Sequence, residues 1–154
     1  MRLVVAVVGK ARNQALGDAI RDYETRAARY WPLEVHEVKE ERGSASPPAR
    51  VREQEGARLA EKIPGSARTV ACEPGGKDLD SQQFAEMLRT ARDQDRDLAF
   101  LIGGAHGLAA DLAAGSQMRL SLAPWTLPHE LARLVLAEQI YRAGTIVRGE
   151  PYHK

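Results

Sequence analysis

The sequence contains a single cysteine, Cys72, among its 154 residues. One cysteine cannot form a disulfide framework within the chain, and it excludes a metal cluster built from several cysteines. The histidines, aspartates and glutamates show no spacing typical of a metal site either. We therefore expect a protein without structural disulfides and without bound metal.

Neither sign of charge prevails in the sequence. Lysine and arginine number 22 and aspartate and glutamate 21, which gives a net charge of +1 at pH 7. A protein that binds free nucleic acid usually carries a clear basic excess, because its cations displace counterions from the phosphates. Any nucleic-acid partner is therefore expected to be recognised locally.

A long apolar run is also missing. The run near the N-terminus, residues 2–8, is far too short to span a bilayer, and no small-residue cleavage site follows it. We expect neither a membrane anchor nor a signal peptide, and we predict a cytoplasmic protein.

The sequence does contain a regular alternation of strand and helix patterns. Its length, with 44% hydrophobic and 28% charged residues, is typical of one soluble globular domain. Apolar runs and helical spacing predict strands at 2–8, 33–39, 68–72, 97–103 and 118–123, and helices at 13–30, 52–63, 81–91, 108–115 and 128–144. Ser81 is the predicted N-cap of the third helix, and Pro128 lies in the first turn of the last. This alternation indicates an α/β fold with a mostly parallel sheet flanked by helices on both faces.

Three of the predicted strands end in turns rich in glycine or proline: ACEPGG, IGGAHG and LAPWTLP. In open parallel sheets, ligands bind at the carboxyl ends of strands. The pair Gly103 and Gly104 lets a flat ligand or a phosphate approach the backbone, although such a pair is more often simply a sharp turn. No G-x-G-x-x-G follows the first strand, which argues against a dinucleotide-binding Rossmann domain, a Rossmann methyltransferase and a flavodoxin-like phosphate-binding domain.

The last predicted helix has apolar residues on more than one side. Leu131, Leu134 and Val135 face one way, whereas Leu136 and Ile140 lie roughly opposite. One side can pack on the sheet, and the other is covered either by a second subunit or by further parts of the same chain. We favour a homodimer.

Three ordered segments, LIGGAHGL, LSLAPWTLPHELARLVLAEQIYRA and the terminal PYHK, resemble the corresponding segments of the bacterial RlmH family. The members are SPOUT-superfamily methyltransferases that act on N3 of a pseudouridine in 23S ribosomal RNA. The resemblance extends over essentially the whole chain, including the opening RLVVAVVGK and the mid-chain PGGK, and is weakest from Glu40 to Ala67. It implies a single SPOUT methyltransferase domain over residues 1–154.

The resemblance also implies a fold and a cofactor that periodicity could not have shown. The fold is an α/β knot, in which the C-terminal segment threads through a loop as a trefoil, and the cofactor is S-adenosyl-L-methionine. The family further implies a homodimer whose active site is completed by the partner subunit, and a target in the helix 69 stem-loop of 23S rRNA. By similarity, the cofactor contacts are Cys72, Gly103, Leu122, Ala123, Pro124, Trp125, Thr126 and Leu127.

Some positions depart from the family pattern. Ala105 and His106 stand where proline and an acidic or other polar residue are more common, and Gly144 stands where a bulky aromatic is common. We expect His106 to affect how the rim of the site meets RNA. Gly144 is expected to loosen the end of the last helix.

The terminal PYHK holds the first candidates for catalysis. Methyl transfer to an imide nitrogen requires aligned reactants and removal of a proton. His153 is the candidate base, Tyr152 is expected to stack on a nucleobase, and Lys154 to pair with a phosphate. Sequence alone favours a frayed terminus without a role, and it is the family's similar ending that favours a catalytic tail.

The last helix holds the remaining candidates. His129 and Arg133 are one turn apart and can project together toward the cofactor turn, where Arg133 would hold a phosphate or orient the base. A contribution to helix polarity explains His129 equally well. Glu138 and Arg142 are four residues apart, and a surface salt bridge is favoured for Glu138 over a role at the shared active site.

The predicted function is therefore methylation of N3 of a pseudouridine in 23S rRNA. The near-zero net charge favours the assembled ribosome over protein-free RNA as substrate. Two alternatives remain open. One is a SPOUT methyltransferase that acts on another RNA nucleotide, and the other is a non-catalytic knot protein that binds RNA or a nucleotide.

Overall fold

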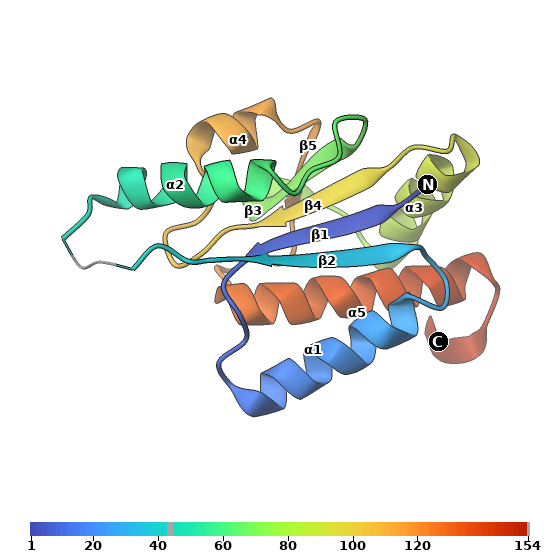
Figure 1. Ribbon diagram of the computed structural model, residues 1–154. Coiled ribbons are helices and arrows are strands. Elements are labelled where there is room, and N and C mark those ends of the chain that lie inside the picture. The colour runs from blue at the N-terminus through green and yellow to red at the C-terminus, as the bar shows by residue number, and fades with distance from the viewer. Residues whose placement is uncertain (43–44, 154) are drawn as a thin grey trace.

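The computed structural model describes residues 1–42 and 45–153, with only the backbone of His153, so Lys154 lies outside the described residues. Within these residues, five strands form one sheet in the order β2-β1-β4-β3-β5, and every neighbouring pair is parallel (Figure 1). The strands are β1 (Leu3–Val8), β2 (Leu33–Val38), β3 (Arg68–Asp78), β4 (Leu98–Ile102) and β5 (Met118–Ser121). The predicted parallel sheet is confirmed.

Helices cover both faces of this sheet, as the alternating pattern predicted. The helices are α1 (Gln14–Ala27), α2 (Pro48–Ala60), α3 (Ser81–Asp93), α4 (Ala110–Gly115) and α5 (His129–Val147), followed by a 3-10 helix (Pro151–His153). Figure 1 shows α1 and α5 beneath the sheet and α2 and α4 above it. The α3 residues Phe84 and Leu88 belong to the same apolar cluster as Leu136 and Ile140 of α5, so α3 lies on the same face of the sheet as α1 and α5.

The first strand shows why the fold takes three layers. All six residues of β1 are buried. Val5 and Val7 pack in the layer that contains α5, whereas Ala6 and Val8 pack in the layer that contains Leu59 of α2. Successive residues of a strand point to opposite faces, so a strand that is apolar at every position needs cover on both.

The helix α3 begins with a capping arrangement that corrects the predicted N-cap. The cap is Asp80 rather than Ser81: the Asp80 carboxylate accepts a hydrogen bond from the Gln83 backbone N–H at 2.7 Å, and the Gln83 side chain accepts one from the Asp80 N–H at 3.0 Å. This reciprocal pair is a capping box. The Ser81 hydroxyl donates instead to Gln139 Oε1 at 2.8 Å and links α3 to α5.

The PGGK segment does not end β3, as the sequence had suggested, but forms an excursion within it. Cys72 and Lys77 both pair with Leu120 of β5, so the residues between them loop out. Gly75 has φ +79°, and a Cβ on Gly76 would lie 2.7 Å from backbone atoms of Leu120. Glycine is required at both positions. The excursion carries Glu73 and Pro74 to the carboxyl end of the neighbouring strand β4.

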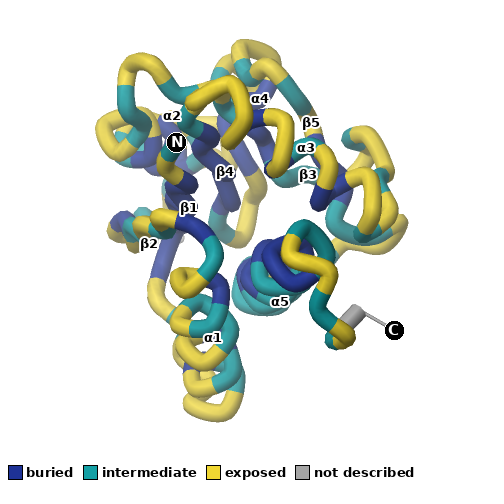
Figure 2. Tube along the Cα trace, turned by 90° about the vertical axis from the view of Figure 1, so that its right-hand side faces the viewer, coloured by how far each residue is buried: buried dark blue, intermediate teal, exposed yellow. Residues whose placement is uncertain are grey.

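The final helix α5 lies between α1 and α3 on one face of the sheet (Figure 2). Leu136 and Ile140 are completely buried. Leu131, Leu134 and Val135, which the sequence places on another side, are half-buried. An apolar strip of α5 is therefore only partly covered by its own chain.

Candidate cofactor-binding site

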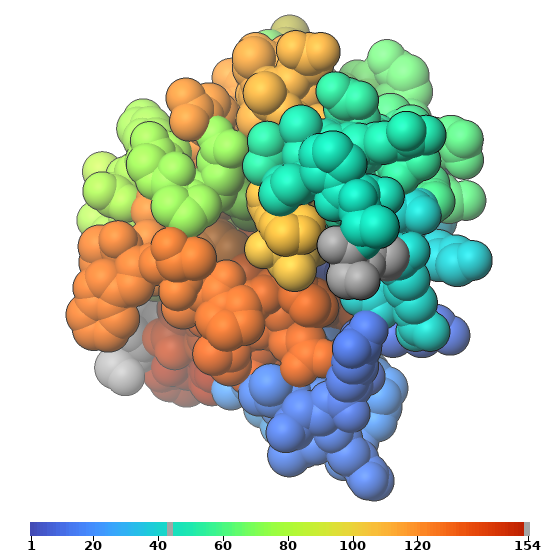
Figure 3. All heavy atoms as spheres, turned by 90° about the vertical axis from the view of Figure 1, so that its left-hand side faces the viewer, coloured from blue at the N-terminus to red at the C-terminus, as the bar shows by residue number. Residues whose placement is uncertain are grey.

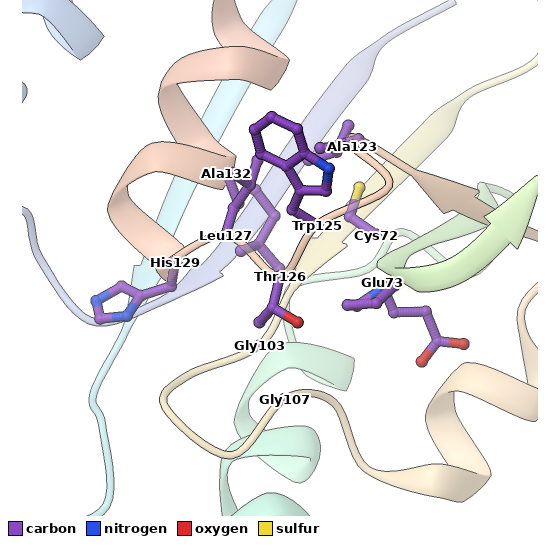
Figure 4. A pocket seen from close by; sticks show the side chains of 13 residues that line it. Cys72, Glu73, Gly103, Gly107, Ala123, Trp125, Thr126, Leu127, His129 and Ala132 are labelled. Atoms are coloured by element: carbon purple, nitrogen blue, oxygen red, sulfur yellow. The ribbon is translucent and has the colours of Figure 1, made fainter. Parts of the chain in front are cut away.

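A pocket opens at the carboxyl edge of the sheet, where the turns after β4 and β5 meet the excursion of β3. It encloses about 110 Å³. Figure 4 shows Trp125, Leu127 and Cys72 around this hollow, with His129 at one border and Glu73 at the other. The lining residues are Cys72, Glu73, Pro74, Ile102, Gly103, Gly107, Leu122, Ala123, Trp125, Thr126, Leu127, His129 and Ala132.

The pocket gathers most of the residues expected to contact a cofactor. Of the eight, seven line it, and Pro124 lies within the same loop. Sequence reasoning missed Glu73, Pro74 and Gly107, although the ACEPGG and IGGAHG turns contain them. Glu73 and Pro74 reach the pocket through the excursion of β3, and Gly107 reaches it because the turn after β4 folds back on Gly104. No local sequence pattern predicts either feature.

The turn after β4 explains the glycine pair. The Gly107 N–H donates to the Gly104 carbonyl at 3.0 Å, and Gly107 has φ +80°. A Cβ on Gly103 would lie 2.5 Å from the Gly107 carbonyl oxygen and 2.6 Å from the Leu108 nitrogen. Because these are backbone atoms, no rotation of a side chain could make room. The turn is thus sharp, and its own backbone requires glycine at position 103, which also lines the pocket. The approach of a ligand to this backbone stays a prediction.

A buried carboxylate supports this turn from behind. A Cβ on Gly104 would lie 2.8 Å from Glu55 Oε2, which has no hydrogen-bond partner among the described residues. The other oxygen, Oε1, accepts from the Glu41 backbone N–H at 2.9 Å. Glu55 therefore connects the glycine turn to the segment that follows β2.

The loop after β5 supplies the apolar wall of the pocket. Ser121 begins it, and its hydroxyl donates to the Ala123 carbonyl at 2.8 Å. Trp125 is 76% exposed, although large apolar side chains are usually covered. An exposed aromatic ring at the mouth of an apolar hollow is suited to cover a flat ligand.

Cys72 is a wall residue rather than a nucleophile. Burial raises the pKa of its thiol to about 12, against a smaller opposing effect of a hydrogen bond with the Leu101 backbone. The thiol is therefore neutral at physiological pH, and the nucleophilic form of cysteine is the thiolate.

His129 and Arg133 do not project together, contrary to expectation. His129 borders the pocket. Arg133 is buried and forms ion pairs with Glu24 of α1, at 2.8 Å, and with Glu37 of β2, at 2.6 Å. Burial alone would lower the pKa of Arg133, but the hydrogen bonds to both carboxylates outweigh it and raise the pKa. Arg133 holds α5 to α1 and β2 instead of facing the pocket.

Tyr152, in the C-terminal segment, is anchored on helix α5 of the same chain, away from the pocket. The Tyr152 hydroxyl donates to Glu138 Oε1 at 3.1 Å, and its ring centroid lies 4.6 Å from that of Tyr141. Burial, the hydrogen bond to Tyr23 and the charge of Glu138 raise the pKa of Tyr152. Tyr141 follows His129 by 12 residues on α5, which corresponds to ~18 Å along the helix. The side chain of His153 and the whole of Lys154 lie outside the described residues.

Glu138 has the expected partner, Arg142, at 2.7 Å. Besides this pair it accepts the Tyr152 hydroxyl, and the Arg142 guanidinium lies 4.9 Å from the centre of the Tyr152 ring. The pair is thus part of the anchor of the tail. Gly144 belongs to the same region: a Cβ there would lie 2.6 Å from Tyr30 Cβ, so this glycine lets Tyr30 pack on the helix backbone. It is a packing contact rather than a loosened helix end.

Two further expectations concern metals and membranes. In the described part of the chain, no group of three or more histidine, cysteine, aspartate or glutamate residues is arranged to hold a metal ion. Among the helices of the same residues, none has the length and apolar character needed to cross a bilayer.

Comparison with known proteins identifies the family to which this architecture belongs. The family described as "Predicted SPOUT methyltransferase" matches residues 1–153. Ribosomal RNA large subunit methyltransferase H of Gemmatimonas aurantiaca is 58% identical, and the protein of the same name from Anaeromyxobacter dehalogenans is 43% identical, each over the full length of both chains. A probable methylase family protein from Haemophilus influenzae Rd KW20 has a similar fold, with a TM-score of 0.60 at 12% identity, over 99% of this chain and 70% of that one. The chain belongs to the SPOUT methyltransferase family.

Proposed function

We propose that the protein is an S-adenosyl-L-methionine-dependent methyltransferase that modifies N3 of a pseudouridine in the helix 69 stem-loop of 23S rRNA, in the cytoplasm and on the assembled ribosome. The observation that carries the proposal is the pocket formed by the turns after β4 and β5 and by the excursion within β3. It lies in a chain 58% identical, over its full length, to a protein named Ribosomal RNA large subunit methyltransferase H. The pseudouridine and the stem-loop rest on the resemblance of the three sequence segments.

The residues of the pocket fit this cofactor. Its walls are mostly apolar, and Gly103, which has no side chain to project from the turn after β4, lines it together with the Leu122–Leu127 loop. The enclosed 110 Å³ is less than the ~300–1,000 Å³ of typical small-molecule sites. We therefore expect only the adenosine end to be enclosed, between the Gly103 turn and the Leu122–Leu127 loop, with the methionine end in the open mouth.

A homodimer would complete this site. The tail lies ~18 Å along α5 from the pocket of its own subunit, held there by Glu138 and Tyr141. A tail that acts in catalysis must therefore reach the pocket of a partner subunit. The half-buried strip of Leu131, Leu134 and Val135 is a surface that such a partner could cover.

The chain's residues then divide the work of the reaction. The cofactor supplies an activated methyl group. N3 of pseudouridine must lose its proton as it forms the new bond to carbon, and we assign this proton to His153 of the partner's tail. Tyr152, with its hydroxyl on Glu138 and its ring beside Arg142, holds the tail in place rather than stacking on a nucleobase. His129, at the border of the pocket, is placed to meet the target nucleotide.

The threading of the C-terminal segment through a knot stays a prediction of the resemblance. The position of β5 at the edge of the sheet, beside β3, supports it. So does the meeting of the turns after β4 and β5 at one pocket.

The first experiment is transfer of tritiated methyl groups to ribosomes that lack this modification, followed by mapping of the labelled nucleotide. The protein should label one pseudouridine of the large-subunit RNA, and a chain without its last three residues should bind the cofactor but transfer nothing. Label on a different nucleotide would reassign the target. Cofactor binding without any transfer would indicate a non-catalytic binding protein.

The shared active site has a separate test. The tail-deleted chain and an Ala123→Arg chain, in which the pocket wall is blocked, are each expected to be inactive. Mixed dimers of the two contain one intact pocket with one intact partner tail, so mixing should restore part of the activity. No restoration in verified mixed dimers would contradict a tail that acts across the interface.

A further inference from the structure

A second hollow lies on the same edge of the sheet as the cofactor pocket. It is formed where β1 and β2 end, and it measures about 470 Å³. We call it the lysine groove. Its lining residues are Gly9, Lys10, Arg12, Glu37, Val38, Lys39, Glu40 and Arg42.

The charges of the lysine groove do not cancel. Glu37 is already paired with the buried Arg133 at 2.6 Å. Glu40 is paired with Arg12 and, at 3.6 Å, with Arg42.

Lys10 and Lys39 are exposed, and among the described residues neither forms an ion pair with a carboxylate. Two unneutralised ammonium groups therefore remain, in a protein whose overall net charge is +1.

The wall that carries Lys39 is fixed to the helix behind it. The Arg58 guanidinium donates to the Lys39 carbonyl at 2.8 Å and forms an ion pair with Glu41. The Glu41 backbone N–H donates to Glu55 at 2.9 Å. The backbone is thereby positioned before any partner arrives, so only the exposed lysine side chain has to be ordered on binding.

The groove adjoins the cofactor pocket. His129 lines the pocket, and its Nε2 lies 3.6 Å from the position of a Cβ on Gly9, which lines the groove. On the same border, the Arg12 backbone N–H donates to Glu130. In Figure 3 the residues after β1, in blue, lie beside the start of α5, in orange. A chain that entered the pocket with one nucleotide would lie over Lys10 or Lys39 with its neighbours.

We propose that the lysine groove binds the RNA backbone next to the target nucleotide, with Lys10 and Lys39 each contacting a phosphate. The proposal rests on the proposed function, because it takes RNA as the substrate. A lysine ammonium suits a phosphate as a point charge. Two such contacts in the right place can serve a protein that lacks a broad basic face, since the remaining specificity comes from shape.

The test combines the variant Lys10→Gln/Lys39→Gln with the control Lys62→Gln, which removes one exposed lysine beyond the end of α2. Binding to unmodified ribosomes is measured at several salt concentrations. Each lost phosphate contact lowers the magnitude of the slope of log K against log salt by about 0.7 to 0.9. The slope of the double variant should therefore be smaller by about 1.4 to 1.8, and the slope of Lys62→Gln should be unchanged. The KM for ribosomes should rise about tenfold or more, with kcat and the Kd for the cofactor unchanged. Lys10→Arg/Lys39→Arg should restore binding.

Hydroxyl-radical footprinting of the ribosomal RNA identifies the partner. The unaltered protein should protect the backbone beside the methylated nucleotide, and the double variant should lose this protection. A salt slope that is unchanged in the double variant would overturn the proposal. Weaker ribosome binding by the double variant with an unchanged RNA footprint would also overturn it, because the lysines would then contact an acidic ribosomal protein instead of RNA. If the unaltered protein methylates RNA and Lys10→Gln/Lys39→Gln binds ribosomes as tightly as it does, the lysine groove has no role in RNA binding, and the proposed function stands. If the unaltered protein protects RNA through the two lysines but transfers no methyl group, the groove is supported and the proposed function is wrong.

Discussion

The fit of Gly144 against Tyr30 leads to a prediction in which two known effects oppose each other. In an exposed helix interior, Gly→Ala stabilises by about 1 kcal/mol. Here a Cβ at position 144 would lie 2.6 Å from Tyr30 Cβ and 2.8 Å from its Cδ1. The ring must move, and overpacking of this kind costs about 1–3 kcal/mol.

Displacement of Tyr30 has further costs. Its hydroxyl donates to Glu150, and its ring packs on the edge of Tyr141 with centroids 5.8 Å apart. Loss of a hydrogen bond to a carboxylate near the surface costs about 1 kcal/mol. The overpacking and the lost bond together outweigh the gain in helix propensity, so Gly144→Ala should destabilise the protein by about 2 kcal/mol. For a chain of this size, that lowers the Tm by roughly 4 to 8 °C.

A double-mutant cycle isolates the contact. Thermal and urea unfolding are measured for Gly144→Ala, Tyr30→Ala, the double variant and the unaltered protein. Once Tyr30 is truncated, the alanine at position 144 has room, so it should stabilise the Tyr30→Ala background by about 1 kcal/mol. The coupling between the two positions should therefore be about 3 kcal/mol. A Gly144→Ala protein as stable as the original, or additive effects in the double variant, would refute the reasoning.

Three further predictions concern the site and its supports. Gly103→Ala places a Cβ against the Gly107 backbone, so calorimetry should find the Kd for S-adenosyl-L-methionine raised at least ~10-fold in a protein that remains folded; an unchanged Kd would place the cofactor elsewhere. Arg133→Met leaves two carboxylates without their shared cation and should cost about 3 kcal/mol of stability in urea unfolding, whereas a loss of cofactor or RNA affinity at unchanged stability would restore the binding role expected from sequence. The raised pKa of Cys72, about 12 against 9.0 for a free thiol, keeps the folded protein protonated where the unfolded chain is not. The free energy of unfolding should therefore be unaffected below pH 9 and fall by up to ~1.4 kcal/mol per pH unit above it. Cys72→Ala should lose this part of the slope, and equal slopes in both proteins would contradict it.

Local sequence patterns predicted the alternation of strands and helices and the parallel sheet. The run at residues 2–8 predicted a strand covered on both faces, and all of β1 is buried. Errors arose where two residues could serve the same purpose, as with the cap of α3. The deciding signal was Gln83 three residues after Asp80, which completes the capping box only for that residue.

The site was less predictable because its supports are distant in sequence. The partners of Arg133 are Glu24 and Glu37, separated from it by 109 and 96 residues. From the sequence alone, Arg133 differs little from any arginine one turn after a histidine. The loop expected to contact the cofactor was identified by its resemblance to a family. The excursion of β3 that brings Glu73 to the pocket depends instead on the close approach of Gly76 to β5.

The placement of the two tryptophans gives this protein a pair of separate optical reporters. Trp31 is 2% exposed and donates its indole N–H to the Ile140 carbonyl at 3.0 Å. Its fluorescence is therefore expected to change when α5 leaves the core. Trp125 is largely exposed to solvent at the mouth of the pocket. Its emission is open to quenching by iodide until a ligand covers the ring. The Trp31→Phe variant reports occupancy of the pocket through Trp125, and the Trp125→Phe variant reports integrity of the core through Trp31. Neither measurement needs an added label.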